Sequence, residues 1–91
     1  MISALGGKVR LAPSRLTYRI VEPTTTIVLL RVTRRGTTPW LAKLAAQHYD
    51  PTATYFAQWT PRLRGDYRYC ASATDVVGNS SLTSCRWVHV T

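Results

Sequence analysis

Two cysteines, Cys70 and Cys85, stand on two alternating stretches in the last third of this chain. The stretches are residues 67–73 and 84–90, and residues 75–79 between them have the composition of a turn. When the stretches are folded onto each other about that turn, Cys70 lies opposite Cys85. This coincidence fixes the register of a β-hairpin and predicts a disulfide, which indicates an all-β domain of a secreted or surface protein.

The cysteine pair has two alternatives to a disulfide, namely two free thiols in a reducing compartment and a metal site. A zinc site needs about four ligands. Only His48 and His89 are present to complete one, and their spacing matches no known pattern. We therefore expect the disulfide, no metal and no cofactor. In the chain-entropy model, closing this loop stabilises the fold by about 3 kcal/mol.

Strand alternation assigns the two faces of the hairpin. The apolar face, which we expect to meet the core, consists of Tyr67, Tyr69, Ala71 and Ala73. The cysteines then lie on the outer face together with Trp87, which is opposite Arg68 in a predicted cation–π pair. The same register directs Arg86 inward, so either its side chain passes the sheet edge or a β-bulge resets the register.

The turn between the two arms contains Asp75, Gly78 and Asn79. A calcium loop would need several oxygen ligands, usually with more than one carboxylate, and Asp75 is the only carboxylate nearby. We therefore expect a structural turn, which Asp75 caps and in which Gly78 adopts a left-handed backbone conformation.

Four stretches upstream have the alternation or the β-branched content of strands, and each is followed by glycine or proline. They are residues 8–11, 16–21, 25–33 and 54–59. Short strands separated by turn residues are typical of a β-sandwich.

Residues 38–48 are ambiguous between helix and strand. Thr38 and Pro39 resemble the start of a helix, and apolar residues then recur at helical spacing. A sandwich, however, needs a middle strand here, and tertiary context often overrides local propensity. We favour a strand over residues 40–44 and a helical turn over 45–48. In that strand the inward residues would be Trp40, Ala42 and Leu44, and the outward ones Leu41 and Lys43.

The length of 91 residues predicts one small domain, and its net charge is +8. The basic residues, mostly arginine, are scattered singly or in pairs, so we expect no nucleic-acid partner. The longest apolar run, residues 27–30, is too short to cross a membrane. Residues 1–7 lack the apolar core of a signal peptide. We expect them to be a linker or terminal tail, with the folded domain over residues 8–91.

Residues 65–80 carry a recognisable pattern. They match G-x-Y-x-(F/Y)-x-(V/A)-x-A-x-D-x-x-G-N, and Trp59 and Leu63 match the usual lead-in. The pattern resembles the penultimate strand of bacterial immunoglobulin-like modules, which are related in shape to fibronectin type III domains. The resemblance extends over residues 55–90. It implies a seven-stranded sandwich in exported and cell-surface proteins, where such modules act as spacers, adhesive units or accessory domains.

The chain departs from antibody-type domains in two ways. Both cysteines are late in the chain, so no bridge can join an early strand to a late one across the core. Arg68 also occupies the position, two residues before the cysteine, where those domains have a tyrosine. Tyr67 and Tyr69 are the candidates for a similar role.

Enzymatic activity is not expected, because no serine has a nucleophile-elbow context and the chain has only 4 acidic residues. The aromatic residues exceed what so small a core can hold completely: Trp40, Tyr49, Tyr55, Trp59 and Trp87. We therefore name Arg62, Arg68 and Trp87 as a candidate binding surface.

Together these observations predict an all-β, immunoglobulin-like β-sandwich of about seven antiparallel strands with a disulfide-linked C-terminal hairpin. We expect a non-catalytic structural or interaction module of an exported bacterial protein, located outside the cell or on its surface. Its expected partners are neighbouring domains of a parent protein, and either cell-wall polysaccharide or another protein. The alternative function is a carbohydrate- or polyanion-binding domain that uses surface arginines and aromatic residues.

Overall fold

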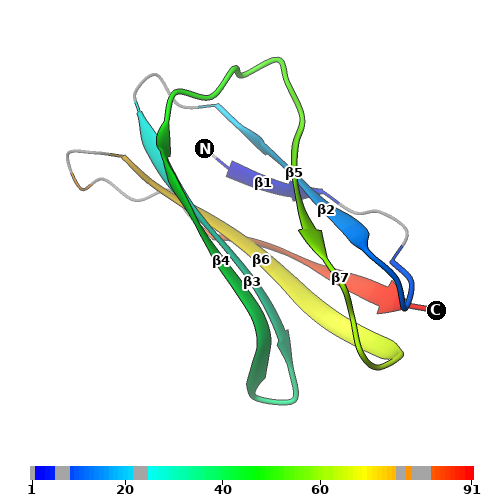
Figure 1. The fold of residues 1–91 in the computed structure, drawn as a ribbon. Helices are drawn as coiled ribbons and strands as arrows, with labels where there is room; N and C mark the ends of the chain where they lie inside the picture. Colours follow the sequence, from blue (N-terminus) through cyan, green and yellow to red (C-terminus); the bar gives the residue numbers. More distant parts are fainter. Residues whose placement is uncertain (1, 6–8, 22–24, 76–77, 79–82) are drawn as a thin grey trace.

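The computed structural model describes residues 2–5, 9–21, 25–75, 78 and 83–91. The strands in chain order are β1 (Ile2–Leu5), β2 (Ser14–Ile20), β3 (Thr26–Arg34), β4 (Thr37–Gln47), β5 (Tyr55–Trp59), β6 (Gly65–Asp75) and β7 (Ser84–Val90) (Figure 1). None of the described residues belongs to a helix long and apolar enough to cross a membrane.

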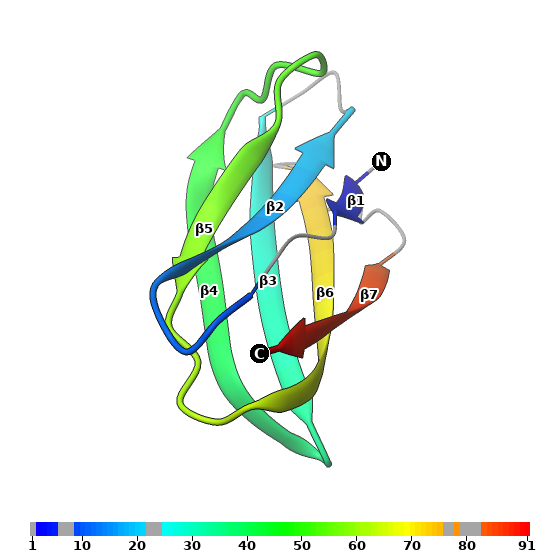
Figure 2. The same cartoon turned by 90° about the vertical axis from the view of Figure 1, so that its right-hand side faces the viewer.

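The strands form two antiparallel sheets. The smaller sheet has the order β1-β2-β5, and the larger has the order β4-β3-β6-β7. Figure 2 shows the smaller sheet in front of the larger one, as in a β-sandwich. The domain is elongated, with extents of 38 × 26 × 18 Å.

The core lies between the sheets because alternate residues of the central strands are apolar. Its buried members include Leu16, Tyr18 and Ile20 of β2, Val28, Leu30 and Val32 of β3, and Tyr67, Tyr69, Ala71 and Ala73 of β6. The Tyr69 hydroxyl also donates a hydrogen bond to the Thr17 carbonyl, 2.9 Å away on the other sheet. The predicted inward face of the hairpin is therefore confirmed.

The ambiguous stretch forms a long edge strand. β4 pairs with β3 in the register Val32↔Trp40 and Leu30↔Ala42, so the strand prediction is confirmed. The expected helical turn over residues 45–48 is wrong, since β4 runs to Gln47. The inward and outward residues are as predicted, because Trp40, Ala42 and Leu44 pack against the core whereas Leu41 and Lys43 are exposed. Pairing with β3 outweighs the local helical pattern.

Two expectations for the start of the chain need correction. Residues 2–5 belong to the expected linker or tail, but they form β1, pair with β2 and bury Ile2 and Ala4. The stretch at 8–11 is no strand in its described part, since Val9 makes only an isolated parallel bridge to Val90. The chain bends beyond it, because the Ser14 hydroxyl accepts the Arg10 N–H at 3.2 Å and lies 3.0 Å from the Ala12 carbonyl.

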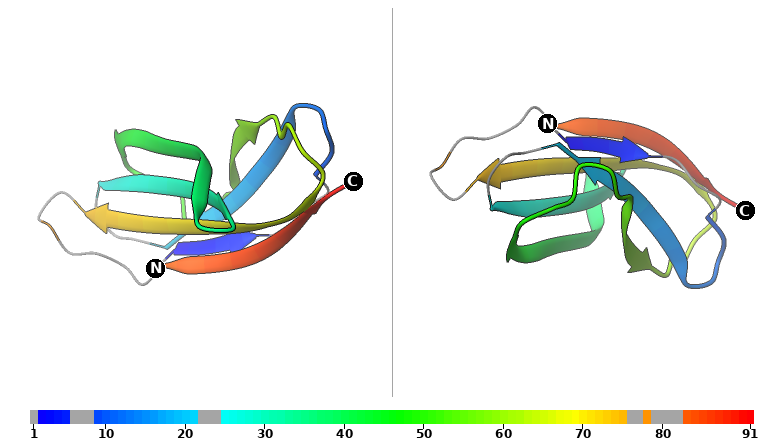
Figure 3. Two further views of the ribbon diagram at one scale, coloured as in Figure 1. Left: turned by 90° about the horizontal axis from the view of Figure 1, so that it is seen from below. Right: turned by 90° about the horizontal axis from the view of Figure 1, so that it is seen from above.

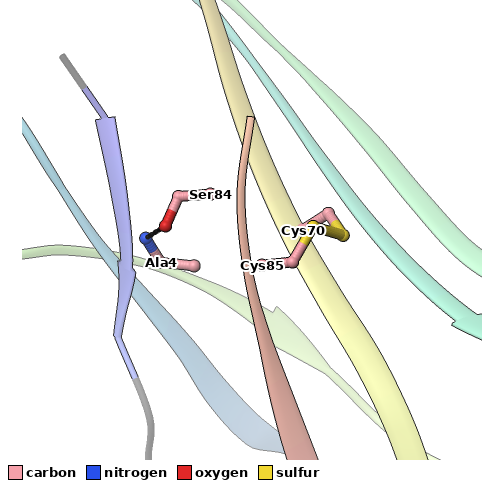
Figure 4. The surroundings of a disulfide bond; sticks show 4 residues. All are labelled: Ala4, Cys70, Ser84 and Cys85. Atoms are coloured by element: carbon pink, nitrogen blue, oxygen red, sulfur yellow. Dashed lines mark hydrogen bonds between the residues drawn. A yellow bond between two sulfur atoms is a disulfide. The ribbon is translucent and has the colours of Figure 1, made fainter. Parts of the chain in front are cut away.

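The C-terminal hairpin has the predicted register, with Cys70 opposite Cys85. The two sulfur atoms are bonded at 2.06 Å, which confirms the disulfide (Figure 4). Figure 4 also shows Ser84 on the other side of β7, where its hydroxyl accepts a hydrogen bond of 3.0 Å from the Ala4 N–H. This bond ties β7 to β1, which lies beside it in both views of Figure 3.

Candidate functional site

The predicted pair of Arg68 and Trp87 lies on the outer face of the larger sheet. The two residues are directly opposite each other on β6 and β7. The Arg68 guanidinium carbon is 6.0 Å from the centre of the Trp87 ring, which is the outer limit of a cation–π contact. Trp87 is 69% exposed, so a large aromatic face is open to solvent beside a cation.

This pair forms one wall of a hollow of about 560 Å³. Its lining residues are Thr33, Arg34, Arg35, Gly65, Asp66, Arg68 and Trp87. They come from the end of β3, the β3–β4 turn and the facing parts of β6 and β7, because antiparallel pairing brings Thr33 opposite Arg68. The turn consists of Arg35 and Gly36, both with positive φ (49° and 80°), as in the tight hairpin turns that match strand twist.

Arg34 is held in place by Tyr67. Its Nη1 donates a hydrogen bond of 3.2 Å to the Tyr67 hydroxyl, and its guanidinium carbon is 5.1 Å from the ring centre. The Tyr67 hydroxyl in turn donates to the Leu63 carbonyl at 2.8 Å. A Cβ on Gly65 would be only 3.0 Å from Nη2 of Arg34, so the glycine leaves room for the guanidinium. Of the two tyrosines considered for a corner-type hydrogen bond, Tyr67 makes it.

The charges in the hollow are unbalanced. Its only carboxylate, Asp66, is 2.7 Å from the Nδ1 atom of His89. Within the described part of the chain, Arg34, Arg35 and Arg68 have no carboxylate partner. Three arginines and one carboxylate therefore line the hollow, and a lining with net positive charge attracts anions.

Arg62 does not share this hollow. It lines a second hollow of about 520 Å³ together with Pro39, Trp40, Trp59, Thr60, Leu63 and Tyr67. The predicted surface is thus divided between two hollows, because Arg62 lines one whereas Arg68 and Trp87 line the other. The hydrogen-bonded pair of Tyr67 and Arg34 connects them, since Tyr67 lines the first hollow and Arg34 the second. Arg34 and Arg35 were not predicted from the sequence as part of a site. In the sequence, the Arg-Arg-Gly stretch indicates only a turn. The pairing of β3 with β6 is what brings this turn close to Arg68.

The remaining aromatic residues mostly belong to the core. Tyr49 and Trp59 are buried, and Tyr55 packs against Tyr49 with ring centres 4.8 Å apart. Burial raises the pKa of the Tyr18 and Tyr69 hydroxyls well above the ordinary tyrosine value, and neighbouring tyrosines add to this at Tyr18. Phe56 is an exception, since it is 52% exposed under the Arg15 guanidinium on the other sheet.

The hairpin turn and Arg86 lie away from the hollow. The Gly78 N–H donates to the Asp75 carbonyl at 3.1 Å and Gly78 has φ +94°, so its predicted left-handed conformation is confirmed. Asn79 lies outside the described residues. Arg86 is exposed, and the described register of β6 and β7 contains no bulge, so the alternative of a bulge at this position is wrong. Among the described residues, no three His, Cys, Asp or Glu side chains gather where they would hold a metal.

Comparison with known proteins gives a fold but no family. No protein-family model matches the chain, and no curated protein matches it. Among solved structures, it is similar to the crystal structure of an engineered protein, with a TM-score of 0.75 and 24% sequence identity. The alignment covers 100% of this chain and 20% of the engineered protein. At this level of identity, the likeness shows the all-β fold alone.

Proposed function

We propose that the chain is an immunoglobulin-like module of the fibronectin type III kind, which acts as a non-catalytic spacer or interaction domain of an exported bacterial protein. Three observations support the module type. The strand orders β1-β2-β5 and β4-β3-β6-β7 suit such a sandwich. The Tyr67–Leu63 hydrogen bond resembles a tyrosine corner. The similar solved structure contains this fold within a longer chain.

The observation that carries the spacer role is the placement of the first and last strands. Ile2 pairs with Ile20 at the end of β2, whereas Val90 pairs with Gly65 at the start of β6. The chain thus enters near one end of the sandwich and leaves at the other, as Figure 1 shows. A 38 Å domain connected in this way extends a string of modules. The Cys70–Cys85 disulfide supports export, because disulfides persist in oxidising compartments.

A tandem protein tests the spacer role. Two copies joined end to end should have a maximum dimension, by small-angle X-ray scattering, that exceeds that of one copy by close to 38 Å. Two copies that fold against each other, with a maximum dimension near that of one, would contradict the proposal.

A second candidate function is binding of polyanions or charged carbohydrate. The convergence of three arginines and Trp87 on one hollow favours it. The chain should then be retained on a heparin column and released by moderate salt, because screening weakens such contacts. A pure spacer with a net charge of +8 should instead elute from heparin at the same salt concentration as from a sulfonate cation exchanger, because overall charge alone then retains it.

A further inference from the structure

We propose that the hollow between Arg34, Arg35, Arg68 and Trp87 binds an acidic saccharide, meaning a sugar chain whose rings carry carboxylate or sulfate groups. This inference rests on the second candidate function and specifies its ligand class. The volume of about 560 Å³ lies within the range of small-molecule sites.

The arginines account for the acidic part of the ligand. A guanidinium donates two parallel hydrogen bonds to a carboxylate or sulfate, which a lysine ammonium cannot do. Arg34 is already oriented by Tyr67 and Gly65, so it loses little freedom on binding. Asp66 also lines the hollow, but its Oδ1 is 2.7 Å from His89.

Trp87 accounts for the saccharide part. Anion binding by itself needs no exposed aromatic ring, yet the indole beside Arg68 is 69% exposed. A pyranose ring has one apolar face of C–H groups, which can stack on an indole while its acidic substituent reaches the neighbouring guanidinium. A single-stranded nucleic acid would be favoured by several aromatic platforms for successive bases. Among the described residues of this face, Trp87 is the only strongly exposed aromatic.

The same face offers a path for further sugar units. Arg31 lies two residues before Thr33 on β3, opposite Cys70, and is exposed. It lines a smaller hollow of about 120 Å³ with Leu29, Cys70, Ser72 and Thr83. Lys43 is exposed next to it on β4, paired with Leu29. Positive charge thus continues along β3 and β4, which suits an oligosaccharide better than a single acidic sugar.

Calorimetric titration of the full chain tests the proposal. The probes are a trimer of galacturonic acid, the matching neutral trimer of galactose, inorganic tripolyphosphate and a short single-stranded DNA. We expect the acidic trimer to bind and the neutral trimer to bind at least about tenfold more weakly, because it lacks the charged hydrogen bonds. Trp87→Ala and Arg68→Gln should each weaken the acidic trimer by about tenfold. Arg68→Lys keeps the positive charge but not the paired hydrogen bonds, so it should weaken binding less than Arg68→Gln does.

Two matched control variants should bind like the wild type. Arg86→Gln removes one positive charge next to Trp87 in sequence but on the other face of β7. Phe56→Ala removes an exposed aromatic ring with an arginine partner, but on the other sheet. Far-UV circular dichroism verifies that all variants fold.

The possible failures can be told apart. If the acidic trimer and tripolyphosphate bind equally and Trp87→Ala changes neither, the site recognises charge alone. Polyanion binding then stands and the saccharide inference is overturned. If DNA binds through Trp87 and the acidic trimer does not, the ligand is a nucleic acid and the inference is again overturned. If no anion binds, both the inference and the second candidate function are wrong.

Discussion

The Tyr67 hydroxyl donates a hydrogen bond of 2.8 Å to the Leu63 carbonyl, four residues earlier, and accepts one of 3.2 Å from Arg34. One side chain therefore links the β5–β6 loop to the end of β3. Its ring also packs edge-on against Trp59, with centres 5.1 Å apart. Because Tyr67 is only 3% exposed, water cannot replace these partners easily.

Tyr67→Phe keeps the ring and removes only the hydroxyl. We expect it to lower the free energy of unfolding by roughly 1–2 kcal/mol, because the Leu63 carbonyl and the Arg34 guanidinium each lose a partner. Urea denaturation followed by tryptophan fluorescence measures the change. A variant as stable as the wild type would show that the loop is held by other contacts.

Tyr49→Phe is the matched control, and we expect the opposite result. Tyr49 is 1% exposed, and within the described part of the chain no group meets its hydroxyl oxygen with hydrogen-bond geometry, although the Tyr18 and Gln47 side chains lie close enough to influence its pKa. A buried polar group without a partner costs desolvation energy. Removing it should leave the urea midpoint unchanged or raise it. A loss as large as that of Tyr67→Phe would mean that the Tyr49 hydroxyl has a partner in solution.

The disulfide should contribute substantially to stability. Cys70 and Cys85 are separated by 15 positions, and a closed loop of this size is worth about 3 kcal/mol in the chain-entropy model. Replacing both cysteines by alanine should lower the free energy of unfolding by about that amount, measured in urea without reductant. Ser72→Ala, on the same outer face of β6, is the control and should have little effect. Two reactive thiols per chain in the denatured, unreduced wild type would refute the bond.

The hairpin could be predicted because its information is local. Strict alternation, a glycine-containing turn and two symmetric cysteines all specify one register. The long edge strand was harder, since Pro39 and the alanine- and leucine-rich residues after it favour a helix locally. Only its pairing with β3 makes it a strand.

The first strand and the hollow depended on contacts between distant parts of the chain. β1 has four residues, too few for a periodic signal, and Ile2 is buried only because it pairs with Ile20. The Arg34–Arg35 pair signals a turn by itself. Its position beside Arg68 follows from the pairing of β3 with β6, which no local pattern in either strand reveals.

Alkaline pH should destabilise the fold through buried tyrosines. Tyr69 is fully buried, and burial raises the pKa of its hydroxyl. Below a pH of about 10, the hydroxyl is protonated in both folded and unfolded chains, so its ionisation takes nothing from the free energy of unfolding. Above that pH, the unfolded chain loses a proton that the folded chain retains. Stability should therefore fall as pH rises, by up to about 1.4 kcal/mol for each pH unit from this residue.

Tyr69→Phe isolates this effect. The variant should be less stable at pH 8 by about 1 kcal/mol, since the hydrogen bond to the Thr17 carbonyl is lost. Between pH 10 and 11, however, its stability should fall less steeply than that of the wild type. Lysines also titrate in this range, but they are present in both proteins and cancel in the comparison. Urea midpoints at pH 8, 10 and 11 measure the two slopes. Equal slopes would mean that the Tyr69 hydroxyl ionises as readily in the folded chain as in the unfolded one.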